Sequence, residues 1–223
     1  MKILVVAATE QEVTGLRSEA LSPKSVTNES GDSELRTFDF ELLITGVGMA
    51  ATAFALGRHL ALHPCDLAIN VGIAGCFDRS AALGELFEVR QDTFAELGAE
   101  DDTSFLPITQ MGFGEDTFYP SKKLTDLYNL FNTFNLKQAD AITVNTVHGN
   151  EESIRKVTQR LNPQLESMEG AAFFYACKQM NVPCLQIRAV SNYVEKRDRD
   201  NWNIPLAIKN LNTFAVEFLK LYA

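Results

Sequence analysis

Short, unbroken apolar segments alternate along this chain with longer segments of helical periodicity. Lys2–Ala8, Leu67–Val71 and Cys184–Val190 are rich in aliphatic and β-branched residues over the length of a strand. A strand that is apolar at successive positions needs cover on both faces, which is typical of parallel sheets between helices. The pattern predicts an α/β fold: a single-domain, three-layer αβα arrangement around a twisted, mostly parallel mixed central sheet.

Periodicity and capping residues place the remaining elements. Thr9 and Glu12 form a capping-box pattern that predicts a helix through Ala20. Residues 1–223 show no repeat or linker, so we expect one domain with its ligand beyond the C-terminal ends of the strands. Further predictions are a polar loop over Pro23–Glu34, a hairpin of Leu35–Asp39 and Glu41–Thr45, strands over Glu85–Phe94 and Ala139–Asn145, and helices over Met49–Leu62, Ser121–Phe134, Glu151–Leu161, Glu169–Met180 and Leu206–Leu221.

Charge and cysteine usage exclude several classes of partner. Lys and Arg total 20 against 29 for Asp and Glu, which gives a formal net charge of −9, and no basic run could follow a phosphate backbone. The four cysteines show no CxxC spacing, and the three histidines show no metal-binding pattern. The apolar start is too short for a membrane span. We therefore expect a cytoplasmic protein that binds neither nucleic acid, membrane nor metal.

Two glycine motifs raise the question of a nucleotide site. Gly46-Val47-Gly48-Met49-Ala50-Ala51 has dinucleotide-fingerprint spacing, but Asp66 precedes the next strand instead of ending it. Gly72-Ile73-Ala74-Gly75 is not a P-loop, because no Lys-Ser or Lys-Thr follows. Both motifs are read as tight strand-to-helix turns, placed where backbone has to approach a ligand closely.

Several motifs resemble, in order and spacing, those of the purine nucleoside phosphorylase and nucleosidase superfamily. The resemblance spans nearly the whole chain. It is carried by Met1-Lys2-Ile3 leading to Glu10-Gln11-Glu12-Val13, Gly46-Val47-Gly48, Asn70-Val71-Gly72-Ile73-Ala74-Gly75, Met168-Glu169 and Arg188-Ala189-Val190-Ser191.

This resemblance implies a nucleoside phosphorylase-like fold that acts on a small-molecule purine nucleoside without a metal or organic cofactor. Glu12 resembles the water-activating carboxylate of the methylthioadenosine/S-adenosylhomocysteine nucleosidases, and Met168 and Glu169 resemble their ribose-binding pair. Sites in this superfamily commonly border a subunit interface, so a homo-oligomer is expected. Other residues expected to bind substrate are Val47, Gly48, Ile73, Ala74, Gly75 and Ser191.

Two positions depart from the adenine-releasing nucleosidases. Asn192 stands where those enzymes have a catalytic aspartate, and Ile73 stands where they carry serine. The segments Thr93–Glu100, Ser191–Arg199 and Trp202–Pro205 resemble the futalosine hydrolase family more specifically. That resemblance implies an N-glycosyl hydrolase that cuts futalosine into hypoxanthine and dehypoxanthine futalosine, in the alternative route to menaquinone.

The chemistry of base release gives Asn192 a role of its own. Cleavage of an N-ribosidic bond sends negative charge into the purine, which the site has to stabilise. The amide carbonyl of Asn192 can accept a hydrogen bond from N7–H while its NH₂ donates to a 6-oxo group, which suits hypoxanthine. Without the resemblance, Asn192 is equally well explained as a turn residue.

The other candidate residues also have structural explanations. Glu12 is by itself the end of a capping box, and Glu169 is a favourable anion at a helix N-terminus. As a base, Glu12 would activate water and repel phosphate, which favours hydrolysis over phosphorolysis. Arg197 or Arg199 could hold the benzoate of futalosine with Trp202 over its ring, or could belong to a solvated loop. His148, before Gly149, is a candidate for stacking on the purine. Open alternatives are a nucleosidase or phosphorylase for other purine nucleosides (inosine, methylthioadenosine, S-adenosylhomocysteine) and a catalytically silent nucleoside-binding protein.

Overall fold

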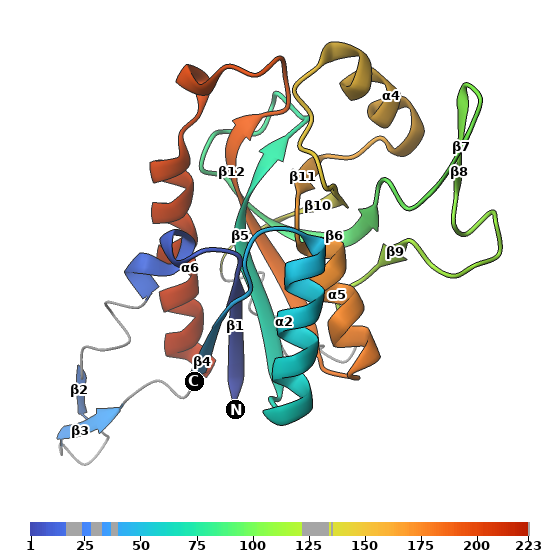
Figure 1. Cartoon of the computed structure of the whole chain (residues 1–223). Helices are drawn as coiled ribbons and strands as arrows, with labels where there is room; N and C mark the ends of the chain where they lie inside the picture. The colour runs from blue at the N-terminus through green and yellow to red at the C-terminus, as the bar shows by residue number, and fades with distance from the viewer. Residues whose placement is uncertain (17–23, 28–32, 37–39, 122–133, 135, 223) are drawn as a thin grey trace.

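A mixed sheet runs through the middle of the molecule, with helices on both faces (Figure 1). The computed structural model describes residues 1–16, 24–27, 33–36, 40–121, 134 and 136–222. The order of the strands in the sheet is β11-β10-β6-β12-β5-β1-β4, and β9 pairs with β6. These strands are β1 (Ile3–Ala7), β4 (Phe40–Ile44), β5 (Leu67–Cys76), β6 (Leu86–Phe94), β9 (Thr117–Phe118), β10 (Lys137–Thr143), β11 (Leu165–Ser167) and β12 (Cys184–Tyr193).

The helices divide the core into two layers. Helices α2 (Met49–Leu62) and α5 (Gly170–Gln179) pack on each other and cover one face of the sheet, where a buried cluster includes Leu56 and Phe173. Helix α6 (Ile204–Tyr222) covers the opposite face, where Phe214 joins a second buried cluster with β1, β5 and β12. The αβα layering that the sequence predicts is therefore confirmed.

The sheet closes on itself at the end where its parallel strands finish. Strand β11 pairs in parallel with β10 and in antiparallel with the last residues of β5, so that β5, β12, β6, β10 and β11 form a ring. Most pairings are parallel, while β12 with β6, β5 with β11 and β6 with β9 are antiparallel. Helix α4 (Glu151–Leu161) lies above this end of the sheet (Figure 1). The closed ring brings residues from distant parts of the sequence together.

The glycines of Gly72–Gly75 lie inside a strand, so their assignment to a strand-to-helix turn is wrong. They continue β5, and they are small because other groups approach the strand closely. A Cβ on Gly72 would lie 1.9 Å from Arg188 Nη1, and a Cβ on Gly75 would lie 2.9 Å from Val194 Cγ2. Similarly, β12 continues through Asn192, which is therefore not a turn residue.

The pairing of the expected hairpin is also wrong. Strand β3 (Ser33–Arg36) pairs with β2 (Lys24–Thr27), which lies in the segment expected to be a polar loop. Strand β4 instead pairs in parallel with β1, because its apolar residues extend the buried sheet. A hairpin of β7 (Gly98–Asp101) and β8 (Ser104–Pro107) carries no clear alternation in the sequence.

The predicted bounds of α2, α4, α5 and α6 agree closely with the structure. The expected bounds of α2 and α4 are matched, and α5 and α6 differ by one or two residues at their ends. The capping box of Thr9 and Glu12 is present and opens a 3₁₀ turn, η1 (Glu10–Val13). The predicted continuation of that helix over 17–20 and nearly all of the Ser121–Phe134 helix lie outside the described residues. Among the described helices, none is long and apolar enough to cross a membrane.

Candidate active site

A cavity of about 370 Å³ lies at the closed end of the sheet. Its walls come from the segment after β1, the ends of β5, β11 and β12, and the first turns of α6. The structure brings together eleven of the thirteen residues that the sequence places in the site: Glu12, Val47, Ile73, Ala74, Gly75, Met168, Glu169, Ser191, Asn192, Arg197 and Trp202. Gly48 and Arg199 lie outside the lining.

Glu12 is fixed at the cavity wall by three hydrogen-bond donors. Its Oε2 accepts from the Thr9 backbone N at 2.9 Å and from Thr9 Oγ1 at 3.0 Å, and its Oε1 accepts from Ile73 N at 3.1 Å. Only 7% of the residue is exposed. Burial raises the pKa of Glu12 above its ordinary value, although the Arg188 guanidinium and these donors act in the opposite direction. A carboxylate with a raised pKa is a stronger base toward water.

Glu169 links the cavity to the N-terminus of α2. Its Oε1 accepts from the Gly48 backbone N at 3.0 Å, and its Oε2 accepts from the Met168 N at 3.3 Å. Gly48 has φ of 98°, a conformation that favours glycine, and this turns its N–H toward the carboxylate. Gly48 therefore acts behind Glu169 rather than on the cavity surface. Both Glu169 oxygens keep lone pairs for hydroxyl groups in the cavity.

A buried polar network supports this wall from inside the ring. Arg188, 1% exposed, donates from Nε to Gln186 Oε1 at 2.7 Å and from Nη2 to Asn70 Oδ1. Asp92 accepts from Gln186 Nε2 at 3.1 Å and from Thr143 Oγ1 at 2.8 Å. Burial raises the pKa of Asp92 to about 6. The network holds the Arg188 charge behind Glu12 without exposing it to the cavity.

Asn192 has a fixed amide orientation. Ser191 Oγ donates to Asn192 Oδ1 at 2.8 Å, and Asn192 Nδ2 donates to the Tyr193 carbonyl at 3.0 Å. Ser191 Oγ also lies 3.1 Å from the Ala74 carbonyl, which is the alternative acceptor for the same hydroxyl proton. Each polar atom of the amide keeps one further hydrogen-bonding position, so Asn192 can present one acceptor and one donor side by side.

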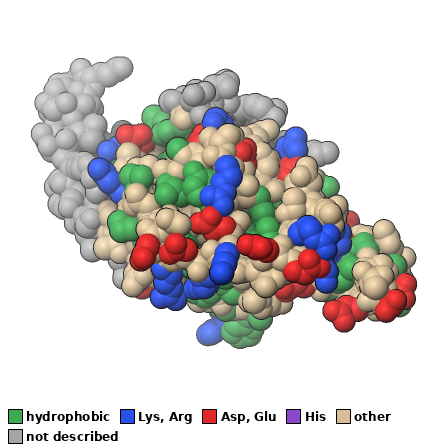
Figure 2. All heavy atoms as spheres, turned by 90° about the horizontal axis from the view of Figure 1, so that it is seen from above, with side chains coloured by type: hydrophobic (Ala, Val, Ile, Leu, Met, Phe, Trp, Pro, Cys, Tyr) green, Lys and Arg blue, Asp and Glu red, His purple; other side chains and the backbone are tan. Residues whose placement is uncertain are grey.

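Two arginines flank Trp202 near the cavity. The Cζ of Arg197 lies 5.0 Å from the Trp202 ring centre, and the Cζ of Arg199 lies 5.9 Å from it. Only Arg197 lines the cavity, and its backbone N bonds to the Gly149 carbonyl at 3.4 Å. Over the end of the molecule seen from above, positive and negative side chains alternate (Figure 2).

Sequence reasoning named His148 without its partner Glu166, and it missed several other lining residues. His148 contacts the buried Glu166 carboxylate through Nδ1, and its backbone N donates to Glu166 Oε1 at 2.9 Å. Glu166 lies on the short strand β11, whose three residues gave no usable periodicity. The other missed lining residues are Ala8, Thr9, Gln11, Val147, Ser167, Tyr193, Glu195, Ile204 and Ile208. Among the described residues, no cluster of three His, Cys, Asp or Glu side chains could hold a metal ion.

Buried carboxylates and an amide, gathered at the closed end of a mixed αβα sheet, define a nucleoside-cleaving type of site. The chain belongs to the phosphorylase superfamily, whose family model matches residues 2–220. It is 32% identical over 218 residues to the futalosine hydrolase of Streptomyces coelicolor, covering 95% of this chain and 92% of that protein. It is 30% identical over 179 residues to the futalosine hydrolase of Thermus thermophilus, covering 79% and 80%.

Solved structures show the same fold. A futalosine hydrolase mutant of Helicobacter pylori strain 26695 matches with a TM-score of 0.80 at 14% identity, covering 99% of both chains. The 5′-methylthioadenosine/S-adenosylhomocysteine nucleosidase of Neisseria meningitidis, in complex with methylthio-immucillin-A, matches with a TM-score of 0.79 at 20% identity, again covering 99% of both. At these identities the likeness concerns the fold, and it confirms the predicted class.

Proposed function

We propose that this protein hydrolyses the N-ribosidic bond of futalosine and releases hypoxanthine and dehypoxanthine futalosine. The observation that carries the proposal is the placement of Glu12 and Asn192 in one cavity. Glu12 is anchored at Ile73 and Asn192 pairs with Gly75, so their anchor points lie about 7 Å apart along β5. Two curated relatives with 30% or more identity are named futalosine hydrolase, which supports the same substrate here.

In the proposed reaction, Glu12 takes a proton from water as the water attacks the anomeric carbon. Glu169 accepts hydrogen bonds from ribose hydroxyls, and its negative charge favours the cationic sugar of the transition state. Met168 packs on the sugar. Asn192 donates to O6 of the departing base through the Nδ2 hydrogen that Tyr193 leaves available.

The charges around the cavity favour water over phosphate as the nucleophile. Among the described lining residues, Arg197 is the only Lys or Arg, and it lies beside Trp202 rather than beside Glu12. The Arg188 guanidinium is engaged by Gln186 and Asn70. A phosphate at Glu12 would face a carboxylate without an arginine clamp.

Arg197 and Trp202 are placed to receive the far end of the substrate. A guanidinium can hold a carboxylate through paired hydrogen bonds, and an indole can cover an aromatic ring. Arg199 lies outside the lining, so Arg197 is the better candidate for the benzoate of futalosine.

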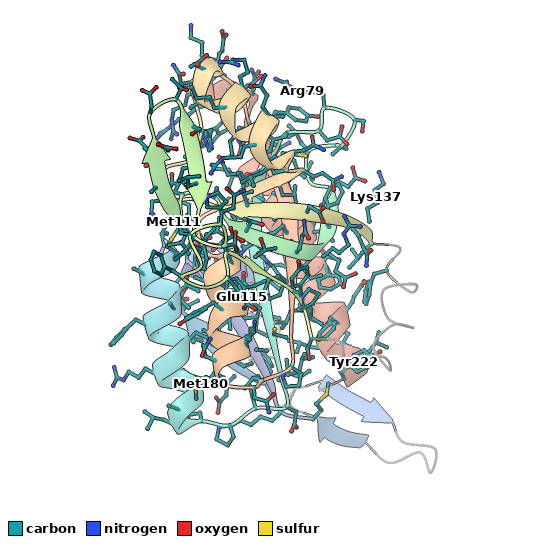
Figure 3. All side chains as sticks on the ribbon, turned by 90° about the vertical axis from the view of Figure 1, so that its right-hand side faces the viewer. Arg79, Met111, Glu115, Lys137, Met180 and Tyr222 are labelled. Atoms are coloured by element: carbon teal, nitrogen blue, oxygen red, sulfur yellow. The ribbon has the colours of Figure 1, made fainter. Side chains whose placement is uncertain are left out.

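We further propose a homo-oligomer that assembles through the face of α2 and α5. Phe54 of α2, Tyr175 of α5 and Met180, which directly follows α5 and is labelled in Figure 3, are 71%, 42% and 38% exposed. Apolar groups of this size gathered on one face mark interaction surfaces. All four cysteines are free thiols, which is consistent with the cytoplasm.

A substrate panel tests the proposed specificity. The protein is incubated separately with futalosine, inosine and methylthioadenosine, and base release is followed by chromatography. The proposal expects the highest kcat/KM for futalosine and the lowest for methylthioadenosine, whose 6-amino group places a donor opposite Asn192 Nδ2. A preference for methylthioadenosine would refute it, and binding without turnover of any of the three would indicate a silent binding protein.

A further inference from the structure

The pair of His148 and Glu166 forms a second polar group in the cavity, separate from the residues already given a role. The imidazole contacts the Glu166 carboxylate through Nδ1, and the other Glu166 oxygen accepts from the backbone N of the same histidine. The Glu166 side chain is 3% exposed and that of His148 is 14% exposed. Two bonds to one residue fix both the ring and the segment that carries it.

The second ring nitrogen of His148 remains available to a ligand. Nε2 forms no hydrogen bond with any described residue. In the described part of the chain, every buried polar side-chain atom has a hydrogen-bond partner, so Nε2, which has none, is not fully buried. Since His148 lines the cavity, this leaves one accessible ring nitrogen at the cavity wall. The Glu166 carboxylate occupies Nδ1, so Nε2 is the ring nitrogen that a ligand can reach.

The register of the sheet places this pair across the cavity from Asn192. Gly75 pairs with Asn192 on one side and with Glu166 on the other. Directly paired residues point to the same face of a sheet, and neighbouring strands lie about 4.8 Å apart, so Asn192 and Glu166 flank Gly75 with about 10 Å between their strands. Val194 Cγ2 lies where a side chain on Gly75 would be, and Asn192 and His148 line the cavity on the β12 side and the β11 side of β5.

The departing base needs a proton that Asn192 cannot supply, because an amide does not ionise at neutral pH. We propose that His148, positioned by Glu166, is a catalytic residue that protonates the purine on the edge opposite Asn192. This inference rests on the proposed nucleoside hydrolysis. As the bond from C1′ to N9 breaks, its electron pair enters the purine, and N3 takes the Nε2 proton. Water forms the new bond to C1′ and passes its proton to Glu12, and solvent then returns that proton to His148.

Leaving-group dependence tests the role of His148. His148→Phe keeps a flat ring for stacking but cannot donate a proton, and His148→Gln keeps a polar partner for Glu166. His63→Phe, an exposed position, is the matched control. Each variant is assayed on futalosine, on inosine, which lacks the far carboxylate, and on 4-nitrophenyl β-D-ribofuranoside, whose leaving group departs as a stable anion.

Loss of a general acid should lower kcat by about 10²–10⁴-fold on both purine nucleosides and by less than about tenfold on the nitrophenyl riboside. Glu166→Gln still accepts a bond from the ring but removes the charge, so it should lower kcat on the purine nucleosides while KM stays within about twofold. A loss confined to futalosine would mean that His148 reads the carboxylate. Equal loss on all three substrates would mean a structural role, and no loss would also overturn the proposal.

The same assay separates this inference from the proposed substrate. If the wild type cleaves inosine but not futalosine, the assignment of futalosine fails, and the comparison of inosine with the nitrophenyl riboside still decides the role of His148. If futalosine is cleaved and the variants lose activity equally on all substrates, only the role of His148 fails. A wild type that cleaves none of the three overturns both.

Discussion

Replacing Asn192 by aspartate tests how the site selects the purine. The amide Nδ2 donates to the Tyr193 carbonyl at 3.0 Å, while Oδ1 accepts from Ser191 Oγ. In Asn192→Asp, a carboxylate oxygen would replace Nδ2 and face that carbonyl. Two acceptors at this distance repel, so the new carboxyl group is expected to hold a proton and donate it to the Tyr193 carbonyl.

Asn192→Asp is expected to lower kcat for the 6-oxo substrate. The variant loses the donor to O6, where negative charge develops, and removal of such a donor typically costs about 10²–10³-fold in kcat. The 6-amino analogue, aminofutalosine, meets an acceptor instead and should gain relative to futalosine.

The assay is the ratio of kcat/KM for futalosine to kcat/KM for aminofutalosine, measured for wild type and variant. We expect the ratio to fall by at least about 10²-fold. Asn203→Asp is the matched control, because Asn203 lies outside the cavity lining and its Oδ1 accepts from Leu206 N, which a carboxylate can also do. An unchanged ratio in Asn192→Asp, whatever the absolute rates, would show that Asn192 does not read the base.

Three further substitutions test other parts of the site. Glu12→Gln should lower kcat for futalosine by about 10²–10⁴-fold with binding retained. Because the new NH₂ group would face one of the backbone donors Thr9 N or Ile73 N, the stability of the variant is measured in parallel. Wild-type turnover would mean that Glu12 only caps the η1 turn. Arg197→Ala should raise KM for futalosine and leave KM for inosine nearly unchanged. Arg199→Ala is the control, because Arg199 also lies beside Trp202 but outside the cavity lining, and it should change neither KM. Equal effects of Arg197→Ala on both substrates would mean that the loop has a structural role. Asp92→Asn tests a pH dependence of stability. Burial raises the folded-state pKa of Asp92 to about 6, so the contribution of protonated Asp92 to the free energy of unfolding is complete below the ordinary pKa of an aspartate. This contribution falls as the pH rises through about 6, by about 3 kcal/mol in all. The difference in unfolding free energy between wild type and Asp92→Asn, from urea titrations between pH 4 and 7, should follow that curve, and a pH-independent difference would contradict it.

The sequence predicts the layers of this fold because its central strands are apolar on both faces. The runs that become β1, β5 and β12 leave no alternative to burial between helices. The C-terminal ends of these strands are harder to predict from the sequence. Gly72 and Gly75 have the composition of a turn, and only the close approach of Arg188 and Val194 explains why glycine continues the strand.

The site shows the same division. Glu12 and Asn192 could be identified from chemistry and resemblance, because activating water needs a carboxylate and donating to a 6-oxopurine needs an amide. The pairing of β11 with both β10 and β5 is a long-range contact that local patterns do not encode. For that reason Glu166 was missed altogether, and His148 was considered without the partner that orients it.

The most direct test of the account is the dependence of futalosine cleavage on phosphate. Wild-type protein, dialysed free of phosphate, is given futalosine alone or futalosine with added phosphate, and hypoxanthine and the sugar product are separated by chromatography. If Glu12 activates water, hypoxanthine is released at the same rate in both, and the sugar product carries no phosphate. Release that requires phosphate and yields a sugar 1-phosphate would contradict the account.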